Sequence, residues 1–301
     1  MSENQEELNY LRLLRDILHG SERTDRTGVG TYSIFGSQLR FSLENNKVPM
    51  LTTKKIFTKG VIEELLFFLR GETDTKKLEA KGVNIWKGNT TREFLDKRGL
   101  VDLPEGDMGK GYSFQYRNFG GKIISNKYDA NKRPPMNRYA DGVDQINEAL
   151  NLLKTDPYSR RILVSAWNPK QLSETSLPPC HCFYQMYVDN GKLSLQWYQR
   201  SVDAFLGWPI NVLSYAILTR LFAKAANLEP GELIFTGGDI HIYKNHIKQV
   251  MEQLSRDPYP FPTMNINKKI ETVEDMENLS YEDFIFENYQ CHPTIKAPMC
   301  V

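Results

Sequence analysis

Apolar residues recur along the chain with the periods of helices and strands, and these periods predict the order of the elements. Leucines recur at helical spacing over 8–18 and stop at Gly20, so an amphipathic helix opens the chain. The segment 32–41 has the composition of a strand, and 61–69 is apolar enough for a buried helix. A further helix is predicted over 143–153.

Two apolar runs in the second half predict a β-hairpin. The runs cover 183–188 and 192–200, and an Asn-Gly pair at 190–191 separates them. Asn-Gly is the strongest short signal for a two-residue hairpin turn. Because Cys180 and Arg200 stand at the far ends of the two arms, the hairpin brings them to neighbouring positions.

The remaining pattern predicts a mixed sheet layered with helices. Strands are expected over 162–167 and 233–236, and Asn211 opens a helix over 212–226 that is apolar on most of its surface. This alternation indicates the α+β class, with mixed α/β layers. One domain over 1–301 is the expected organisation.

Composition excludes several partners. The 301 residues are 40% hydrophobic and 25% charged, and 38 Lys and Arg balance 37 Asp and Glu, so no global field attracts DNA or an anionic membrane. No apolar run approaches the roughly 20 residues that cross a bilayer. Four cysteines and a polar first segment predict reduced thiols in the cytoplasm, in the nucleus, or in a host cytoplasm for a viral protein.

The polar stretch 121–141 is expected to be a surface loop.

Glu64 is predicted to point inward. It shares one helical stripe with Val61, Leu65 and Phe68. A buried carboxylate is costly, so this one is expected to be hydrogen-bonded, protonated near neutral pH, or holding a water for proton transfer. A structural ion pair explains the pattern equally well.

Cys180 follows two prolines in Leu177-Pro178-Pro179-Cys180-His181. The prolines restrict the backbone, and an arginine brought alongside favours the thiolate over the thiol. A nucleophile beside an anion site is the chemical interpretation. The alternative is a free cysteine used for packing.

Other polar positions have structural alternatives. Arg26 lies in a turn-rich segment and could close over an anion, or be an ordinary surface arginine. Arg160 and Arg161 precede a strand and could be a solvated pair. Asn211 could be a helix N-cap.

The motifs together resemble one enzyme family. They are Ser165-Ala166-Trp167-Asn168-Pro169, Leu177-Pro178-Pro179-Cys180-His181, Tyr198-Gln199-Arg200-Ser201-Val202-Asp203, Pro209-Ile210-Asn211 and Gly238-Asp239-Ile240-His241-Ile242-Tyr243. In this order they resemble the folate-dependent, cysteine-nucleophile thymidylate synthases, from Asp25-Arg26-Thr27-Gly28 to Val301. The resemblance implies the thymidylate synthase-like fold, with a sheet face as the homodimer interface. It also implies reductive methylation of dUMP to dTMP by 5,10-methylenetetrahydrofolate, without a metal.

The resemblance assigns the substrate-binding roles. Cys180 would add to C6 of the uracil and make C5 nucleophilic. The implied phosphate ligands are Arg26, Arg200 and Ser201, beside Gln199, with Arg160 and Arg161 reaching in from the partner subunit. Asn211 would bind the uracil edge, and His241 with Tyr243 the sugar 3′-hydroxyl. A metal site formed by His241 with His246 and Cys182 lacks convincing ligand spacing.

Proton transfer and folate binding follow from the same resemblance. Glu64, Tyr112, Asn168 and water would move protons at the pyrimidine. Arg200 and Asp203 are also implied as catalytic residues, and Asp203 would in addition hold the pterin ring. The other implied folate contacts are Lys54 at the tail, Ile210 at the aminobenzoyl ring, and Trp86 with Val301 as the closing residues.

Four residues depart from the family pattern, at Tyr116, Trp208, Ile210 and Cys300. They are expected mainly on the folate side, where they would affect cofactor affinity and water exclusion. A dUMP 5-hydroxymethylase, in which water intercepts the same intermediate, is therefore the alternative. A silent relative that binds nucleotides or RNA is a third hypothesis.

Overall fold

The computed structural model describes residues 4–25, 27–123 and 139–300. Arg26, Val301 and most of the predicted surface loop 121–141 therefore lie outside the described residues. At the two ends of that loop, Lys122–Ile123 pairs with Tyr139–Ala140 as β3 and β4.

A six-stranded sheet forms the centre of the molecule, in the order β1-β2-β8-β7-β6-β5. Its strands are β1 (Ser21–Arg23), β2 (Thr31–Ser42), β5 (Leu163–Ser165), β6 (His181–Asp189), β7 (Lys192–Asp203) and β8 (Glu229–Tyr243). Strands β7 and β8 are parallel, and the other neighbours are antiparallel. The predicted mixed sheet is confirmed.

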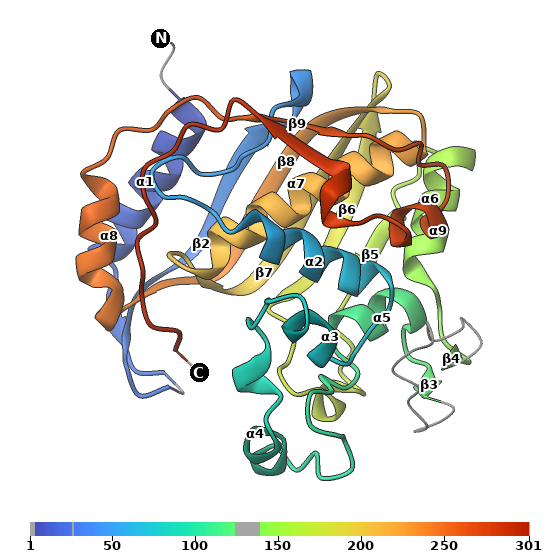
Figure 1. Cartoon of the computed structure of the whole chain (residues 1–301), viewed down its shortest axis with the longest axis horizontal. Helices are drawn as coiled ribbons and strands as arrows, with labels where there is room; N and C mark the ends of the chain where they lie inside the picture. The colour runs from blue at the N-terminus through green and yellow to red at the C-terminus, as the bar shows by residue number, and fades with distance from the viewer. Residues whose placement is uncertain (1–3, 26, 124–138, 301) are drawn as a thin grey trace.

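Helices pack on the sheet and around its edges. They are α1 (Gln5–Leu18), α2 (Thr58–Leu69), α3 (Lys76–Glu79), α4 (Arg92–Lys97), α5 (Tyr112–Asn118), α6 (Gln145–Thr155), α7 (Gly207–Ala225), α8 (Ile247–Leu254) and α9 (Val273–Glu277). In Figure 1, α7 lies across the sheet and α2 lies beside it on the same side. Strands β9 (Thr263–Ile266) and β10 (Phe284–Glu287) form a separate pair. The helices predicted from the leucine pattern and around Glu64 are confirmed.

The hairpin of β6 and β7 is formed as the Asn-Gly pair predicts. Asn190 and Gly191 both have positive φ, 47° and 76°, which suits a type I′ turn. His181 pairs with Gln199 at the open end, and the amide of Arg200 donates to the carbonyl of Cys180 at 2.9 Å. The hairpin therefore places the thiol residue next to the arginine.

Two element boundaries were predicted incorrectly. Helix α7 begins at Gly207 instead of after Asn211, so Asn211 is not its N-cap. Pro209 falls in the first turn, where a helix needs no amide donor from that residue.

Strand β8 is much longer than predicted. It continues through Gly238, where a side chain would meet Tyr198 Oη at 2.8 Å and the Arg200 carbonyl at 2.9 Å. The glycine therefore permits close approach of neighbouring strands and does not end the strand.

The paired residues of the parallel strands β7 and β8 change from apolar to polar along the strands. On the helix-covered face, Trp197 and Phe235 lie side by side in the core. Further along that face the paired positions become polar, as Ser201 opposite Asp239 and then Asp203 opposite His241. Ligand sites in sheets with parallel strands commonly form at these carboxyl ends.

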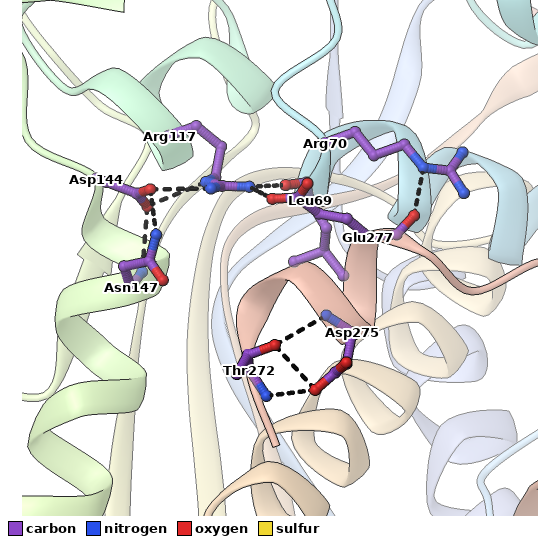
Figure 2. Close-up of polar contacts among 8 residues, drawn as sticks. All are labelled: Leu69, Arg70, Arg117, Asp144, Asn147, Thr272, Asp275 and Glu277. Atoms are coloured by element: carbon purple, nitrogen blue, oxygen red, sulfur yellow. Dashed lines mark hydrogen bonds and ion pairs between the residues drawn. The ribbon is translucent and has the colours of Figure 1, made fainter. Parts of the chain in front are cut away.

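A buried arginine on α5 joins α2, α9 and the start of α6. Arg117 of α5 binds the carboxylates of Asp144 and Glu277 and the carbonyl of Leu69 at the end of α2 (Figure 2). Arg70 donates to the carbonyl of Glu277 at 2.8 Å. Arg117 thus fixes α5 against the carboxyl end of α2.

The opposite sheet face is exposed. Tyr187 is 64% exposed and Phe183 is 39% exposed. Phe183 stacks on Tyr198 of the neighbouring strand with ring centroids 5.8 Å apart. An exposed aromatic surface of this kind is typical of an interface.

Candidate active site

A cavity of about 560 Å³ opens at the carboxyl ends of β7 and β8. Its volume lies within the range of about 300–1,000 Å³ that is common for small-molecule sites. The predicted site residues that line it are Glu64, Trp86, Tyr112, Cys180, Gln199, Arg200, Ser201, Asp203, Asn211, His241 and Tyr243. The fold therefore gathers residues from α2, α5, α7, β7 and β8 in one place.

Cys180 is held from two sides. The hydroxyl oxygen of Tyr112 accepts from the amide of Cys180 at 2.6 Å and from that of His181 at 3.3 Å. On the other side, the Arg200 guanidinium donates to the carbonyls of Pro178 and Pro179 at 3.0 and 2.9 Å. The diproline segment is thus fixed by the arginine predicted to accompany the thiol.

Arg200 supplies positive charge beside the Cys180 segment, whereas His181 does not. Burial lowers the pKa of His181 to about 4, against an opposing contact with Asn211. Burial also raises the pKa of the Cys182 thiol, although the nearby Arg200 opposes this shift. Cys182 is therefore a poor nucleophile, and its thiol bonds the Cys180 carbonyl at 3.8 Å.

Glu64 reaches the cavity from α2. Its carboxylate accepts from the indole of Trp86 at 2.7 Å. Burial raises its pKa to about 7, and the Trp86 hydrogen bond only partly offsets that effect. The ion pair in this helix belongs to the preceding residue, because Glu63 meets Lys81 at 2.5 Å. Glu64 can therefore accept or donate a proton near neutral pH.

An amide network holds Asn211 at the wall of the cavity. Asn211 Nδ2 donates to Gln199 Oε1 at 3.2 Å, and Gln199 Nε2 donates to the Ser201 carbonyl at 3.0 Å. The indole of Trp197 donates to the same Gln199 oxygen at 3.3 Å. Such a network fixes which amide edge faces a ligand.

Asp203 shapes the turn that leads into α7. Its Oδ1 accepts from the amides of Phe205 and Leu206, both at 3.0 Å. The carboxylate therefore organises the turn as well as lining the cavity. The expectation from sequence concerned ligand binding alone and missed this structural task.

Lys54 does not line the cavity in this structure. It is 5% exposed, donates to the carbonyl of Phe205 and lies 3.6 Å from the centre of that ring. Burial lowers its pKa to about 7, although Asp203 opposes the shift. A folate contact would require this side chain to leave the carbonyl.

Several other predicted residues lie outside the cavity lining. Asn168 is buried, with its amide donating to Gln115 at 3.3 Å and Gln171 at 2.9 Å. Arg160 and Arg161 are exposed and precede β5, and Ile210 packs against the core. Arg26 and Val301 lie outside the described residues.

Trp208, one of the four departures expected mainly on the folate side, lies in the core and not in the cavity lining. Its ring is fully buried and stacks on Tyr10 at 4.5 Å and 8°. It also meets Phe41 and Phe235. Sequence spacing did not reveal this packing, because Tyr10 is distant along the chain.

Tyr116 also lies away from the cavity lining. Its hydroxyl meets that of Tyr215 at 3.5 Å, and its ring packs edge-on to Tyr184. Tyr116, which departs from the family pattern, therefore lies among buried aromatic residues outside the cavity lining.

The carboxyl-terminal segment reaches the cavity through Cys300, which was expected on the folate side, and through Met299, which sequence reasoning missed. Met299 and Cys300 line the cavity. His246 Nε2 bonds the Pro298 carbonyl at 2.7 Å, and Asn245 contacts Cys300 at 3.6 Å. Figure 1 shows this segment descending beside the lower ends of the central strands.

Asp25 lines the cavity and makes hydrogen bonds with residues close to it in the chain. Asp25 accepts from Thr27 and from the amide of Gly30, at 2.6–3.0 Å. Despite burial, these hydrogen bonds lower the pKa of Asp25. Its place in the first motif was a signal that it belongs to the site.

Among the described residues, no group of three His, Cys, Asp or Glu is arranged to hold a metal ion. Within the same part of the chain, no helix has both the length and the apolar character needed to cross a membrane.

Comparison with known proteins identifies the family of the chain. The family model described as thymidylate synthase matches residues 8–301. The thymidylate synthase of Herpesvirus ateles is 47% identical, over 100% of both chains. That of Saccharomyces cerevisiae is 47% identical over 99% of this chain and 98% of its own. The human thymidylate synthase is 47% identical over 98% of this chain and 91% of its own. The chain therefore belongs to the thymidylate synthase family.

Proposed function

We propose that the cavity around Cys180 is the site at which this chain carries out the family's reaction. The chain converts dUMP to dTMP, and 5,10-methylenetetrahydrofolate, which becomes dihydrofolate, supplies both the carbon and the hydride. The observation that carries the proposal is the pairing of Arg200 with Cys180, 2.9 Å from amide to carbonyl, at the wall of one cavity.

Cys180 is the nucleophile in this proposal. Its thiolate forms a bond to C6 of uracil, and the ring's π electrons move toward O4, so that C5 becomes nucleophilic. C5 then bonds the one-carbon group of the folate and loses its hydrogen as a proton. As hydride reaches the transferred carbon, the sulfur leaves C6 with its electron pair and the ring double bond returns. Tyr112 and the Arg200 backbone hold Cys180 in place throughout.

The nucleotide is held at both ends. Arg200 and Ser201 bind the phosphate, with Arg26 and with Arg160 and Arg161 of a second subunit. Asn211, supported by Gln199, pairs with the uracil edge. His241 and Tyr243 bind the sugar 3′-hydroxyl. In this structure the Arg200 guanidinium donates to the carbonyls of Pro178 and Pro179, the two residues before Cys180.

Proton transfer is assigned to Glu64, with Tyr112 and Asn168 in support. A pKa of about 7 lets Glu64 act both as a general acid and as a general base at neutral pH. Its hydrogen bond to Trp86 joins the proton-transfer residue to an aromatic wall of the cavity. Asn168 would act through its amide neighbours, because it does not line the cavity.

The folate side is assigned to Asp203, Trp86, Ile210, Lys54 and Val301. Asp203 and Trp86 line the cavity beside Phe68, so a flat ring system has both an acceptor and aromatic contacts there. Closure by the carboxyl-terminal segment would exclude water, which favours hydride transfer over hydration.

The arginine pair requires a homodimer. Arg160 and Arg161 are exposed and do not line their own subunit's cavity. The exposed sheet face with Phe183 and Tyr187 is the proposed interface. A cytoplasmic location is proposed from the cysteine usage.

The hydroxymethylase alternative receives no support from the comparisons, since the three relatives described above are named thymidylate synthases. A catalytically silent, nucleotide-binding relative remains a distinct hypothesis that one experiment tests.

The proposal is tested by replacing the Cys180 thiol with a hydroxyl. Cys180→Ser should lower kcat at least about a thousandfold, because an alcohol is a far weaker nucleophile than a thiolate. Dihydrofolate formation is followed by absorbance, and the adduct with 5-fluoro-dUMP and folate by mass. Cys291→Ser, which lies outside the cavity lining, is the control and should keep both. Undiminished turnover in Cys180→Ser, or a wild type that binds without forming an adduct, would contradict the proposal.

A further inference from the structure

Two charged residues line the cavity beside the sugar-binding histidine and have no role in the assignments above. Asp239 precedes His241 by two positions on β8, so both side chains point toward the cavity. Asp239 Oδ1 lies 3.1 Å from His241 Nδ1. Arg23, at the end of β1, donates through Nη1 to Asp239 Oδ2 at 3.1 Å. The three side chains therefore form a chain of contacts that ends at His241.

The chemistry of the partners fixes the tautomer of the neutral imidazole. An ionised carboxylate only accepts hydrogen bonds, so the hydrogen shared with Asp239 is carried by Nδ1. The neutral ring then presents Nε2 as an acceptor. A sugar hydroxyl can donate to that nitrogen.

The same contacts restrict rotation. Asp239 uses one oxygen for His241 and the other for Arg23, so its carboxylate cannot turn without losing both partners. The ring of Tyr243 stands edge-on to His241, with centroids 5.2 Å apart. His241 is therefore held in orientation as well as in tautomer.

We propose that Asp239 is a positioning residue for sugar recognition, which holds His241 ready to accept from the 3′-hydroxyl of dUMP, and that Arg23 in turn holds Asp239. The inference rests on the proposed role of His241 in binding that hydroxyl. It makes the Arg23–Asp239 pair a determinant of specificity for nucleotides with a free 3′-hydroxyl.

A purely stabilising ion pair is the competing explanation. Arg23 and Asp239 have side chains that are 57% and 35% exposed, and pairs this open to water contribute little to stability. Removing either charge should therefore leave the protein folded, so that substrate recognition can be measured directly.

The experiment combines protein variants with a substrate that lacks the hydroxyl. We would measure kcat/KM for dUMP and for its 3′-deoxy analogue in the wild type, Asp239→Ala, Asp239→Asn and Arg23→Gln. Lys97→Gln, which removes an exposed ion pair on α4, is the control. Thermal unfolding checks that every variant is folded.

Asp239→Ala should lower kcat/KM for dUMP about tenfold or more and leave the value for the 3′-deoxy analogue unchanged. Asp239→Asn keeps an acceptor oxygen and should recover part of the loss, and Arg23→Gln should show a smaller loss. Equal losses for both substrates in Asp239→Ala would overturn the inference, because they indicate a general structural effect.

His241→Ala separates this inference from the function on which it rests. It should abolish the preference for the 3′-hydroxyl. If His241→Ala retains the preference, the proposed sugar contact of His241 is wrong, and the role of Asp239 falls with it. If His241→Ala loses the preference and Asp239→Ala retains it, only the positioning role is wrong.

Discussion

Glu64 shows how burial changes the chemistry of a single residue. Its pKa rises from 4.5 to about 7 in the folded protein. Over this interval the folded state keeps a proton that the unfolded state has already lost. Stability from this group is therefore fully present below pH 4.5 and declines as the pH rises to about 7 and above. At roughly 1.4 kcal/mol per pKa unit, the decline amounts to about 3 kcal/mol.

Glu64→Gln should remove this decline. Urea denaturation of wild type and variant from pH 5 to 8.5 should show the variant gaining stability relative to the wild type as the pH rises. Glu105→Gln, at an exposed position, should follow the wild type at every pH. Parallel curves for Glu64→Gln and wild type would show that the carboxyl is not shifted as described.

Between elements, Arg117 determines how α2 and α5 meet. One guanidinium binds two carboxylates and a helix-terminal carbonyl (Figure 2). Desolvation opposes its charge, but Asp144 and Glu277 more than compensate and raise the pKa of Arg117. Because α2 carries Glu64 and α5 carries Tyr112, this contact sets the spacing of two site residues.

Arg117→Met should destabilise the protein by about 3–5 kcal/mol, because it leaves two partly buried carboxylates without their cation. Arg117→Lys should recover part of the loss. The midpoint of urea denaturation measures both, and Lys97→Met on exposed α4 should leave it unchanged. A midpoint in Arg117→Met equal to that of the wild type would mean that the ion pairs contribute nothing net.

For the whole molecule, the proposed dimer predicts that two inactive variants restore activity together. A protomer with Arg160→Ala and Arg161→Ala keeps its thiol but should fail to supply arginines to its partner. A Cys180→Ser protomer should supply arginines but lack the thiol. A heterodimer of the two has one complete site, so its specific activity should be about half that of the wild type.

The measurement uses two affinity tags to isolate the heterodimer, and steady-state dihydrofolate formation as the readout. Each homodimer, assayed alone, provides the baseline. A heterodimer as inactive as both parents would show that the arginines act within their own subunit, or not at all.

Local patterns in the sequence were sufficient for most elements. Helix α2 and the β6–β7 hairpin depend on apolar period and turn chemistry, which involve residues close together in the chain. The two incorrect boundaries have one cause: Pro209 and Gly238 usually end elements, but a first helical turn tolerates the proline and a close strand contact needs the glycine.

The motifs likewise predicted Cys180, Arg200 and His241 as site residues, because each belongs to a short run of characteristic residues, and the three line one cavity. Contacts between residues far apart in the chain could not be predicted in this way. Arg117 meets Glu277 across 160 positions, and Trp208 stacks on Tyr10 from a distant segment. The burial that moves the pKa of Glu64 and the contact of Arg23 with Asp239 also arise only when remote segments meet. The sequence determines the local conformation and which functional groups are present. The burial and contacts of each side chain depend on tertiary packing between distant segments, which local spacing does not encode.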